Sequence, residues 1–266
     1  MNDSPALAVA IRAARAAAAI VVDAGRDLGR LPSHVKVQGD IVSAADAEAE
    51  NVIAATLRAA FPHDAILGEE SGERAGVAGN GRQWIVDPLD GTLNFVHGYP
   101  YYAISIALLD GARITHAVVL DPVHDELFTA VRGLGAHLNG APLRVSSCTR
   151  LANALVGTVF PTRASPRMPS YLPMFNALVT RCAGIRRAGA CALDLAYLAA
   201  GRLDGFWVMS LERWDVAAGA LLVEEAGGRI GDFAGGPDYL RTNEVIAAAP
   251  GVFSELREAI AAARAA

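Results

Sequence analysis

The chain has 266 residues, of which 53% are hydrophobic and 19% are charged, and its formal net charge is -5 at pH 7. This composition excludes a disordered chain and predicts a globular protein with a substantial core. The negative charge argues against non-specific nucleic-acid binding. The three cysteines, Cys148, Cys182 and Cys191, lack a metal-binding spacing and leave one thiol unpaired. We therefore expect reduced thiols and a cytoplasmic location.

The apolar segments are interrupted by charges. Arg12 and Arg15 precede the apolar stretch 16–22, and Asp23 follows it. Asp3 lies where a signal peptide carries positive charge. We expect neither a membrane span nor a secretory signal.

Two helices are predicted at the start of the chain. Residues 4–28 begin with Ser-Pro and repeat apolar residues at helical spacing. Residues 29–39 are predicted to form a loop, and a second helix is predicted over 43–60. Asp46 falls in the first turn of that second helix, where a carboxylate ordinarily interacts only with the helix dipole.

Two short apolar strands then run directly into acids. Residues 65–67 are followed by Glu69 and Glu70, and residues 84–86 are followed by Asp87. If the two strands are neighbours, Glu69 and Asp87 project into one crevice at the strand ends. The alternative for the first pair of acids is a solvated turn.

Residues 83–95 (QWIVDPLDGTLNF) are the most informative stretch. A proline after Asp87 restricts that residue to extended backbone, and the next residues predict a tight turn. Asp90 and Thr92 are helix-capping types, so a short helix is predicted here. Carboxylates bind hard divalent cations, and a helix N-terminus with the bare Gly91 backbone binds anions. The stretch therefore predicts a metal-bridged phosphate site; the alternative is a surface turn in which Asp90 only caps the helix.

Later segments predict a layered α/β structure. Residues 102–145 alternate short strands with Gly turns, which predicts an antiparallel meander. Asp215 lies in the first turn of a predicted helix. No repeat or flexible linker divides the chain, so we expect one layered α/β arrangement. The second half is predicted to contain helices at 168–183, 191–200, 212–226 and 251–265, and strands at 203–208 and 245–249.

Three motifs, 68–71 (GEES), 84–95 (WIVDPLDGTLNF) and 214–219 (WDVAAG), resemble those of the inositol monophosphatase family in order and spacing. Residues 40–46 (DIVSAAD) are similar to the family's N-terminal signature, with Ser43 where Thr is usual. The resemblance covers nearly the whole chain and is closest to bacterial inositol-1-monophosphatases. It implies an αβαβα sandwich of the type shared with fructose-1,6-bisphosphatase. It also implies a single domain over 1–266, with lobes at about 1–150 and 151–266.

The resemblance implies a site for two or three Mg2+ ions. Glu69, Asp87 and the backbone carbonyl of Leu89 would hold the first ion. Asp87, Asp90 and Asp215 would hold the second, and a third, weaker ion would use Glu69 and waters. Two such ions neutralise phosphate oxygens and lower the pKa of a bound water.

The resemblance also implies roles around the phosphate. Gly91 and Thr92 would receive it, Asp46 would orient Thr92, and Glu69 would activate the attacking water. Further substrate contacts are implied for Asp90, Gly189, Ala190, Cys191, Val208 and Asp215.

One implied contact departs from the family pattern. Val208 stands where the family usually has the Glu that accepts hydrogen bonds from inositol hydroxyls. A valine cannot accept them, and an unpaired polar group costs about 1–3 kcal/mol. Glu212 and Glu225 are the candidates to replace that Glu. The departure weakens inositol as the substrate alcohol and leaves the phosphatase chemistry unaffected.

The implied function is a lithium-sensitive, homodimeric, Mg2+-dependent phosphatase of inositol 1-phosphate or a similar small polyol phosphate. Histidinol phosphate, a nucleotide 3′-phosphate, fructose bisphosphate and NADP are alternative substrates. Arg181, Arg186 and Arg187 would serve a second phosphate, or else lie at a subunit interface or in solvent. His97 is interpreted as structural. An alternative of another class is a binding protein for the transcription machinery, although an intact set of four carboxylates favours catalysis.

Overall fold

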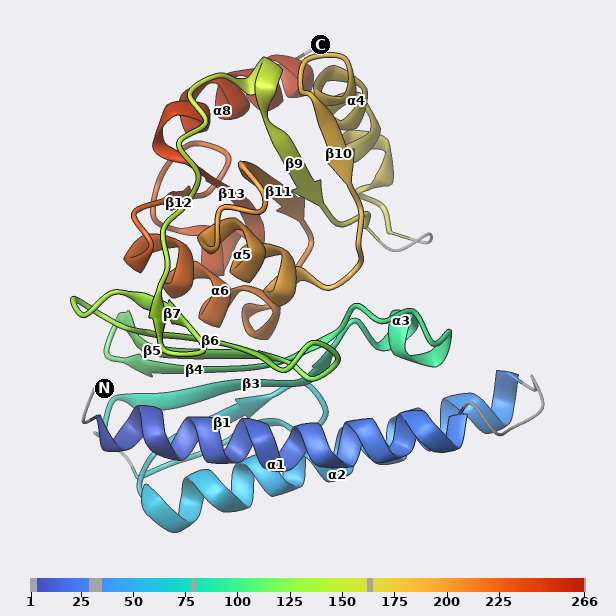
Figure 1. Cartoon of the computed structure of the whole chain (residues 1–266), viewed down its shortest axis with the longest axis vertical. Coiled ribbons are helices and arrows are strands. Elements are labelled where there is room, and N and C mark those ends of the chain that lie inside the picture. Colours follow the sequence, from blue (N-terminus) through green and yellow to red (C-terminus); the bar gives the residue numbers. More distant parts are fainter. Residues whose placement is uncertain (1–3, 29–34, 78–79, 162–164, 266) are drawn as a thin grey trace.

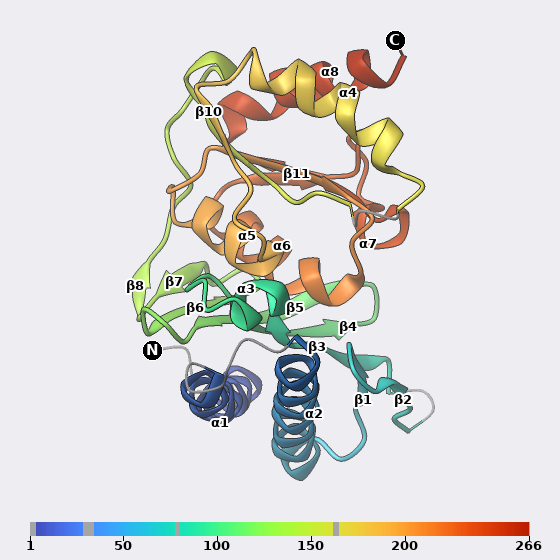
Figure 2. The same ribbon diagram turned by 90° about the vertical axis from the view of Figure 1, so that its right-hand side faces the viewer.

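Five layers are stacked in the computed structural model, which describes residues 4–28, 35–77, 80–161 and 165–265. From the bottom to the top of Figure 1 they are a helix pair, a sheet, a second helix pair, a second sheet and an outer helix pair. Figure 2 shows the same layers from the side. The predicted αβαβα arrangement is confirmed.

The first layer consists of α1 (Pro5–Leu28) and α2 (Val35–Ala60). Both helices bury an apolar face against the first sheet, with residues such as Val21 and Leu57 fully buried. The prediction for α1 is confirmed. The second helix begins at Val35, so the loop predicted through residue 39 and the start predicted at residue 43 are wrong. A single Gly inside α2 costs only about 1 kcal/mol relative to Ala and does not end the helix; residues 29–34 lie outside the described residues.

Helix α1 has the length and composition of a membrane span, contrary to the expectation from its charges. Half of the most apolar stretch, within Pro5–Arg26, is buried inside the protein. Its apolar side packs against α2 and the first sheet. A core helix satisfies the same length and hydropathy criteria, so these features are weak evidence for a membrane.

The first sheet has eight strands in the order β2-β1-β3-β4-β5-β6-β7-β8. Strand β1 runs parallel to β3, with Gly68 opposite Val86. Strand β3 pairs with β4 in antiparallel fashion, and β4 through β8 form the predicted antiparallel meander. The two acid-terminated strands are therefore neighbours. The bounds are β1 Ala65–Gly68, β2 Gly72–Arg74, β3 Arg82–Asp90, β4 Ala103–Asp110, β5 Arg113–Asp121, β6 Glu126–Val131, β7 Ala136–Leu138 and β8 Ala141–Pro142.

The second sheet has five strands in the order β10-β9-β11-β13-β12. Three of them (β9, β10 and β12) are only three or four residues long and lack a predictive pattern. The strand bounds are β9 Leu155–Thr158, β10 Gly184–Arg186, β11 Gly205–Met209, β12 Arg229–Gly231 and β13 Glu244–Ala248. The remaining helices are α3 Thr92–Val96, η1 Leu151–Asn153, α4 Met168–Val179, α5 Cys191–Ala199, α6 Arg213–Glu225, α7 Tyr239–Thr242 and α8 Pro250–Ala265.

Helices α5 and α6 fill the layer between the sheets and approach each other closely (Figure 1). At Gly219 of α6, an added Cβ would lie 2.5 Å from the Cβ of Leu195 in α5. Only glycine permits this approach. One buried cluster runs from Ile85 of the first sheet, through these helices, to Phe206 of the second.

Substituting Gly219→Val tests this close contact. Overpacking a tight core costs about 1–3 kcal/mol, so we expect the free energy of unfolding to fall by about 2 kcal/mol. Urea denaturation measures the change. The control is Gly184→Val, where the nearest atom to an added Cβ is 3.4 Å away. Equal effects of the two substitutions would contradict the packing argument.

Candidate metal and phosphate site

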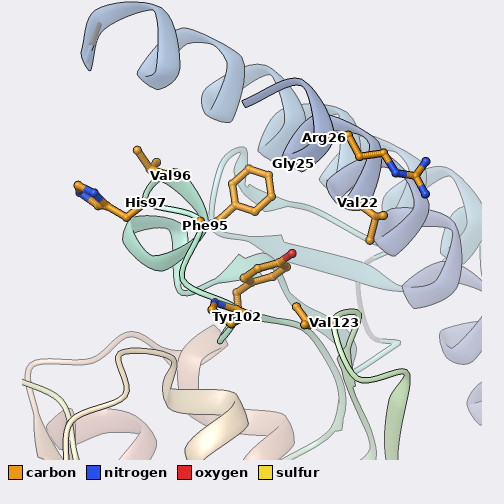
Figure 3. Close-up of a pocket in the computed structure, with 10 residues that line it drawn as sticks. Val22, Gly25, Arg26, Phe95, Val96, His97, Tyr102 and Val123 are labelled. Atoms are coloured by element: carbon orange, nitrogen blue, oxygen red, sulfur yellow. The ribbon is translucent and has the colours of Figure 1, made fainter. Parts of the chain in front are cut away.

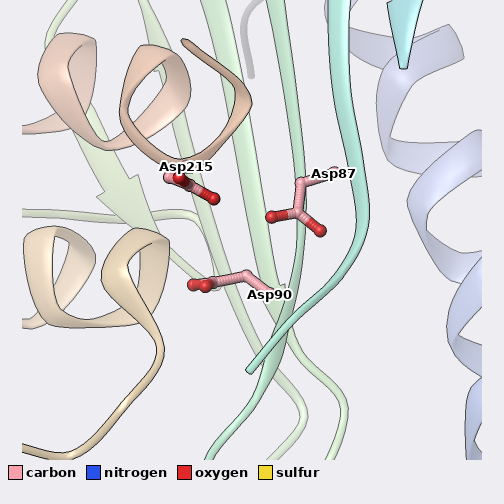
Figure 4. Close-up of side chains that lie close together, drawn as sticks. All are labelled: Asp87, Asp90 and Asp215. Atoms are coloured by element: carbon pink, nitrogen blue, oxygen red, sulfur yellow. The ribbon is translucent and has the colours of Figure 1, made fainter. Parts of the chain in front are cut away.

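Three carboxylates converge where the first sheet meets the middle helical layer. Asp87, Asp90 and Asp215 each offer one oxygen, and these oxygens lie within 4.8 Å of one another. Figure 4 shows Asp87 and Asp90 projecting from β3 toward Asp215 at the start of α6. The structure thus brings together three of the predicted metal ligands.

A β-bulge explains why Asp87 and Asp90 face the same way. In a regular strand, residues three apart point to opposite faces. Here Asp87 pairs with Ser105 and Asp90 with Ala103, so β3 carries one more residue than β4 between the two pairs. The extra residue turns Asp90 toward the side of Asp87. The bulge is stabilised by the Leu89 N–H, which donates to Asp87 Oδ1 at 3.0 Å.

Asp90 caps a helix, but a different helix from the one predicted. Helix α3 has Gly91 at its N-cap and no side-chain cap. The Asp90 carboxylate instead accepts hydrogen bonds from the backbone N–H groups of Cys191 (3.1 Å) and Ala192 (2.7 Å) at the start of α5. These donors and the helix dipole stabilise the negative charge.

Asp215 lies in the first turn of α6, as predicted. Its Oδ2 accepts the Glu212 N–H at 2.8 Å in a capping box, which fixes the side-chain direction. The Ser105 hydroxyl of β4 donates to the carbonyl of Trp214 at 3.3 Å. The start of α6 is thereby held against the sheet that carries the other two acids.

Glu69 joins this group from the neighbouring strand. Its N–H donates to the Val86 carbonyl at 3.2 Å, and its carboxyl hydrogen-bonds to Asp87. The predicted crevice shared by Glu69 and Asp87 is therefore present. Glu69 itself lies in an exposed turn directly after β1, so the alternative of a solvated turn also describes its setting.

Burial and mutual repulsion raise the pKa of every acid in the group. Burial is the main cause for Asp87 and Asp90, whose pKa values lie well above the ordinary 3.8, and neighbouring carboxylates add to it. The same causes raise the pKa of Glu69, and burial raises that of Asp215 to about 7. A divalent cation relieves this repulsion, and an all-oxygen donor set suits Mg2+. The residues fit the implied metal.

The turn after the acids has the shape expected of a phosphate cradle. Gly91 has a φ of 95°, and an added Cβ would lie 3.0 Å from the Tyr101 carbonyl oxygen. The Thr92 hydroxyl donates to the Leu89 carbonyl at 3.1 Å. Leu89, Gly91 and Thr92 thus share one tight turn beside the acids, and their contacts with metal and phosphate stay predictions.

Asp46 lies elsewhere than predicted. Because α2 begins at Val35, Asp46 lies well inside the helix, so its placement in a first turn is wrong. The carboxyl is buried, and burial followed by repulsion from Glu70, Glu69 and Glu50 raises its pKa to about 8. Its Oδ1 has no hydrogen-bond partner among the described residues. The predicted orientation of Thr92 by Asp46 is not seen, since the Thr92 hydroxyl bonds to Leu89.

The predicted substrate wall is present only in part. Ala190 and Cys191 are buried at the start of α5, and the Ala190 Cβ lies 3.1 Å from a Cβ added to Gly91. Gly189 precedes them with a φ of 97°. The Asn94 amide donates to the carbonyls of Tyr101 (2.7 Å) and Ala188 (2.8 Å), which ties this loop to α3.

Val208 does not line an accessible wall. Its side chain has no exposed surface and packs in the middle core with Phe206 and Val245. Glu225 does not replace the missing Glu, because it accepts backbone N–H groups of the turn at Gly133 and Gly135.

Among the other candidate residues, Arg187 lies beside the predicted substrate wall, since its Nη1 would be 3.2 Å from a Cβ added to Gly189. His97 lines a hollow of about 430 Å³ between α1 and α3, with Val22, Phe95 and Tyr102 among its neighbours (Figure 3). Arg187 stacks over the ring of Phe160. The three arginines have separate surroundings and do not converge on one anion: Arg181 lies with Glu255 and Glu258, Arg186 is on β10, and Arg187 is on Phe160.

Sequence reasoning missed two polar contacts near the site. Asn94 bridges two loops, as described above. Asp194, in the first turn of α5, is buried and accepts the Tyr101 hydroxyl at 2.6 Å. A lone Asp within the apolar run 191–200 was the available signal, since buried acids require partners.

Known proteins resemble this chain over its whole length. Residues 2–266 match the sequence model of the Inositol monophosphatase family. The protein called Nus factor SuhB in Pseudomonas aeruginosa is 50% identical over 247 residues, which cover 91% of each chain. A solved structure of the extragenic suppressor protein suhB from Bartonella henselae has a TM-score of 0.87 at 41% identity and covers 97% of this chain and 100% of its own. An inositol monophosphatase from Anabaena has a TM-score of 0.85 at 37% identity and covers 96% and 95%.

The raised pKa values predict a pH-dependent stability of the metal-free protein. Between the ordinary pKa of 3.8 and the folded values of about 8 for Asp46 and about 7 for Asp215, the folded state binds more protons than the unfolded state. Stability therefore falls as pH rises through this window. We expect a lower unfolding temperature at about pH 8 than at about pH 5 after chelation, and a smaller fall with Mg2+ added. A metal-free protein that becomes more stable across this window would refute the repulsion argument.

Proposed function

Because the chain belongs to the inositol monophosphatase family, we propose that it is a Mg2+-dependent phosphomonoesterase of inositol 1-phosphate or a similar small polyol phosphate. The observation that carries the proposal is the convergence of Asp87, Asp90 and Asp215, with Glu69 joining them through its contact with Asp87 from the exposed turn after β1. Four mutually repelling carboxylates destabilise a protein that has no cation to bind. Their retention as a group supports catalysis.

The carboxylates and the Leu89 carbonyl would hold the Mg2+ ions as the resemblance implies, with Asp87 shared between two of them. When bound, the ions supply positive charge to the phosphate oxygens and a water of lowered pKa. Asp90 and Asp215 are each directed by backbone N–H groups, so their oxygens are oriented before an ion arrives. This preorganisation reduces the reorganisation that binding requires.

Protein groups next to the carboxylates bind the phosphate and accept the proton of the attacking water. The Gly91 and Thr92 N–H groups at the start of α3 receive phosphate oxygens. Glu69, whose pKa is raised by burial, accepts the proton of the attacking water. Asp46 lies within electrostatic reach of Glu69, whose negative charge contributes to the raised pKa of Asp46. The alcohol leaves with a proton taken from solvent.

The proposal does not fix which alcohol the substrate ester carries. With Val208 buried in the core and Glu225 occupied, Glu212, exposed at the N-cap of α6, is the remaining candidate acceptor for inositol hydroxyls. Histidinol phosphate is the first alternative, followed by a nucleotide 3′-phosphate, fructose bisphosphate and NADP. Arg181 and Arg186 have separate surroundings, whereas Arg187 lies beside Gly189 and is the candidate among them for contact with a second phosphate.

A second function is favoured by the relatives themselves. The Pseudomonas aeruginosa relative is called a Nus factor, and so is one from Escherichia coli that is 44% identical. We therefore also propose a partner in the transcription machinery, bound as protein, since the net charge of -5 disfavours direct nucleic-acid contact. A homodimer is proposed as well, supported by the exposed apolar side chains of Leu93 and Tyr99, on and after α3. A cytoplasmic location is proposed from the cysteine pattern.

Phosphate release from a panel of esters tests the enzymatic proposal. The panel holds inositol 1-phosphate, glycerol 2-phosphate, histidinol phosphate, fructose 1,6-bisphosphate and adenosine 3′,5′-bisphosphate, each with and without Mg2+ and with added Li+. We expect a Mg2+-dependent rate on one monoester that exceeds the others and falls with Li+. The absence of phosphate release from every ester, with Mg2+ still bound, would favour the binding-protein function.

The variant Asp87→Asn isolates the metal centre. Loss of a residue that merely supports a ligand costs about 10- to 100-fold, so loss of a shared ligand should lower phosphate release by more than about a hundredfold. Because one repelling charge is removed, the metal-free variant should unfold at a higher temperature than the wild type at about pH 8. The control is Asp23→Asn, whose side chain is 74% exposed on α1. Full activity in Asp87→Asn would remove the basis of the proposal.

A further inference from the structure

Glu50 on α2 is a buried carboxylate that the proposed mechanism does not use. Only 2% of its surface is exposed. Its Oε2 accepts the Glu70 N–H at 2.8 Å and its Oε1 accepts the Ser71 N–H at 3.1 Å. Hydrogen bonds from N–H groups to an ionised carboxylate are about twice as strong as neutral ones. Glu50 therefore binds the backbone directly after Glu69.

The chain at Gly68 is shaped to admit this carboxylate. A Cβ on Gly68 would lie 2.3 Å from Glu50 Oε2 and 2.4 Å from its Cδ. No side chain larger than hydrogen fits between β1 and α2 at this point without displacing Glu50. The glycine of the GEES motif is thus explained by contact with Glu50.

Two attachments leave Glu69 little freedom. Before it, Gly68 is paired with Val86 of β3, and the Glu69 N–H donates to the Val86 carbonyl at 3.2 Å. After it, the next two N–H groups donate to Glu50. The backbone is therefore fixed on both sides, which directs the Glu69 carboxyl to Asp87.

This arrangement has an electrostatic cost. Glu50 adds negative charge near Asp46 and Glu69, which already repel each other. Arg74 offsets part of the cost, with its Nη2 3.5 Å from Glu50 Oε1 and its Nε donating to the Ser71 hydroxyl at 2.8 Å. Glu50 thus adds a repulsive negative charge to the cluster, and its backbone hydrogen bonds go to the turn after Glu69.

We propose that Glu50 is a positioning residue for Mg2+ binding: it fixes the turn at Glu70 and Ser71 so that Glu69 faces Asp87. The inference rests on the proposed metal centre and adds to it a residue that touches neither metal nor substrate. Residues that orient ligands in this way typically change metal affinity or activity by about 10- to 100-fold.

Calorimetric titration of the full chain with Mg2+, in the absence of ester, tests the inference. In Glu50→Gln, one acceptor is replaced by an NH2 group that faces a backbone N–H. We expect the dissociation constant for Mg2+ to rise about tenfold or more. The matched control is Glu48→Gln, an exposed residue of the same helix and charge, which should stay within about twofold of wild type because exposed charges are screened.

Gly68→Ala separates position from charge. It keeps the Glu50 carboxylate but displaces it, so we expect a loss of Mg2+ affinity similar to that of Glu50→Gln. Wild-type affinity in Gly68→Ala would mean that Glu50 acts through its charge alone and would overturn the inference. If either variant fails to fold, Arg74→Gln carries the test, with an expected loss of about threefold from a part-exposed ion pair.

The two proposals fail in different ways. Wild-type protein that binds Mg2+ and releases no phosphate from any ester overturns the proposed function and leaves the role of Glu50 intact. Equal Mg2+ affinity in wild type and Glu50→Gln overturns the role of Glu50 alone. Wild-type protein that does not bind Mg2+ overturns the metal centre on which both rest.

Discussion

Repulsion among buried carboxylates is the constraint around which this structure is built. Asp87, Asp90 and Asp215 are held close together, and burial of the first two leaves little water to screen them. Without a cation or hydrogen-bond donors, carboxylates this close together take up protons, because burial and mutual repulsion raise their pKa values. The protein instead supplies backbone N–H donors at each position: the start of α5 for Asp90, the start of α6 for Asp215 and the turn at Leu89 for Asp87. The remaining excess of negative charge is what a bound divalent cation would neutralise.

Each layer of the fold contributes one part of this arrangement. The first sheet brings β1 beside β3 in parallel, which aligns Glu69 with Asp87. The middle helices bring two positive helix ends to the edge of that sheet (Figure 1). Their packing at Gly219 and Leu195 sets the distance between those ends. Helix α2 supplies Asp46 and Glu50 from below. The site is therefore a junction of layers, and distant packing contacts influence its geometry.

The same geometry separates chemistry from substrate choice. The acids and the turn at Gly91 lie in the well-packed junction, whereas the alcohol would meet the loop before α5 and the apolar end of β11. A change at Val208 leaves the carboxylates untouched because the side chain is directed into the core with Val245. The family resemblance consequently predicts the reaction more firmly than the ester. The partner proposed from the relatives called Nus factors requires no feature of the acidic crevice.

Sequence alone determined the layered fold class, most long helices and strands, and the acids of the metal centre, because these follow from periodicity and from motifs at fixed spacing. Tertiary structure decided what depends on residues far apart in the chain. Asp90 caps α5, about a hundred residues away, and not its own turn. Asp46 lies inside a longer helix, and Val208 is enclosed by the core. Glu50 gains a role only because α2 packs beneath the turn at Glu70. Local patterns specify residue types and directions along a strand or helix, whereas hydrogen bonds between layers exist only once the layers have packed.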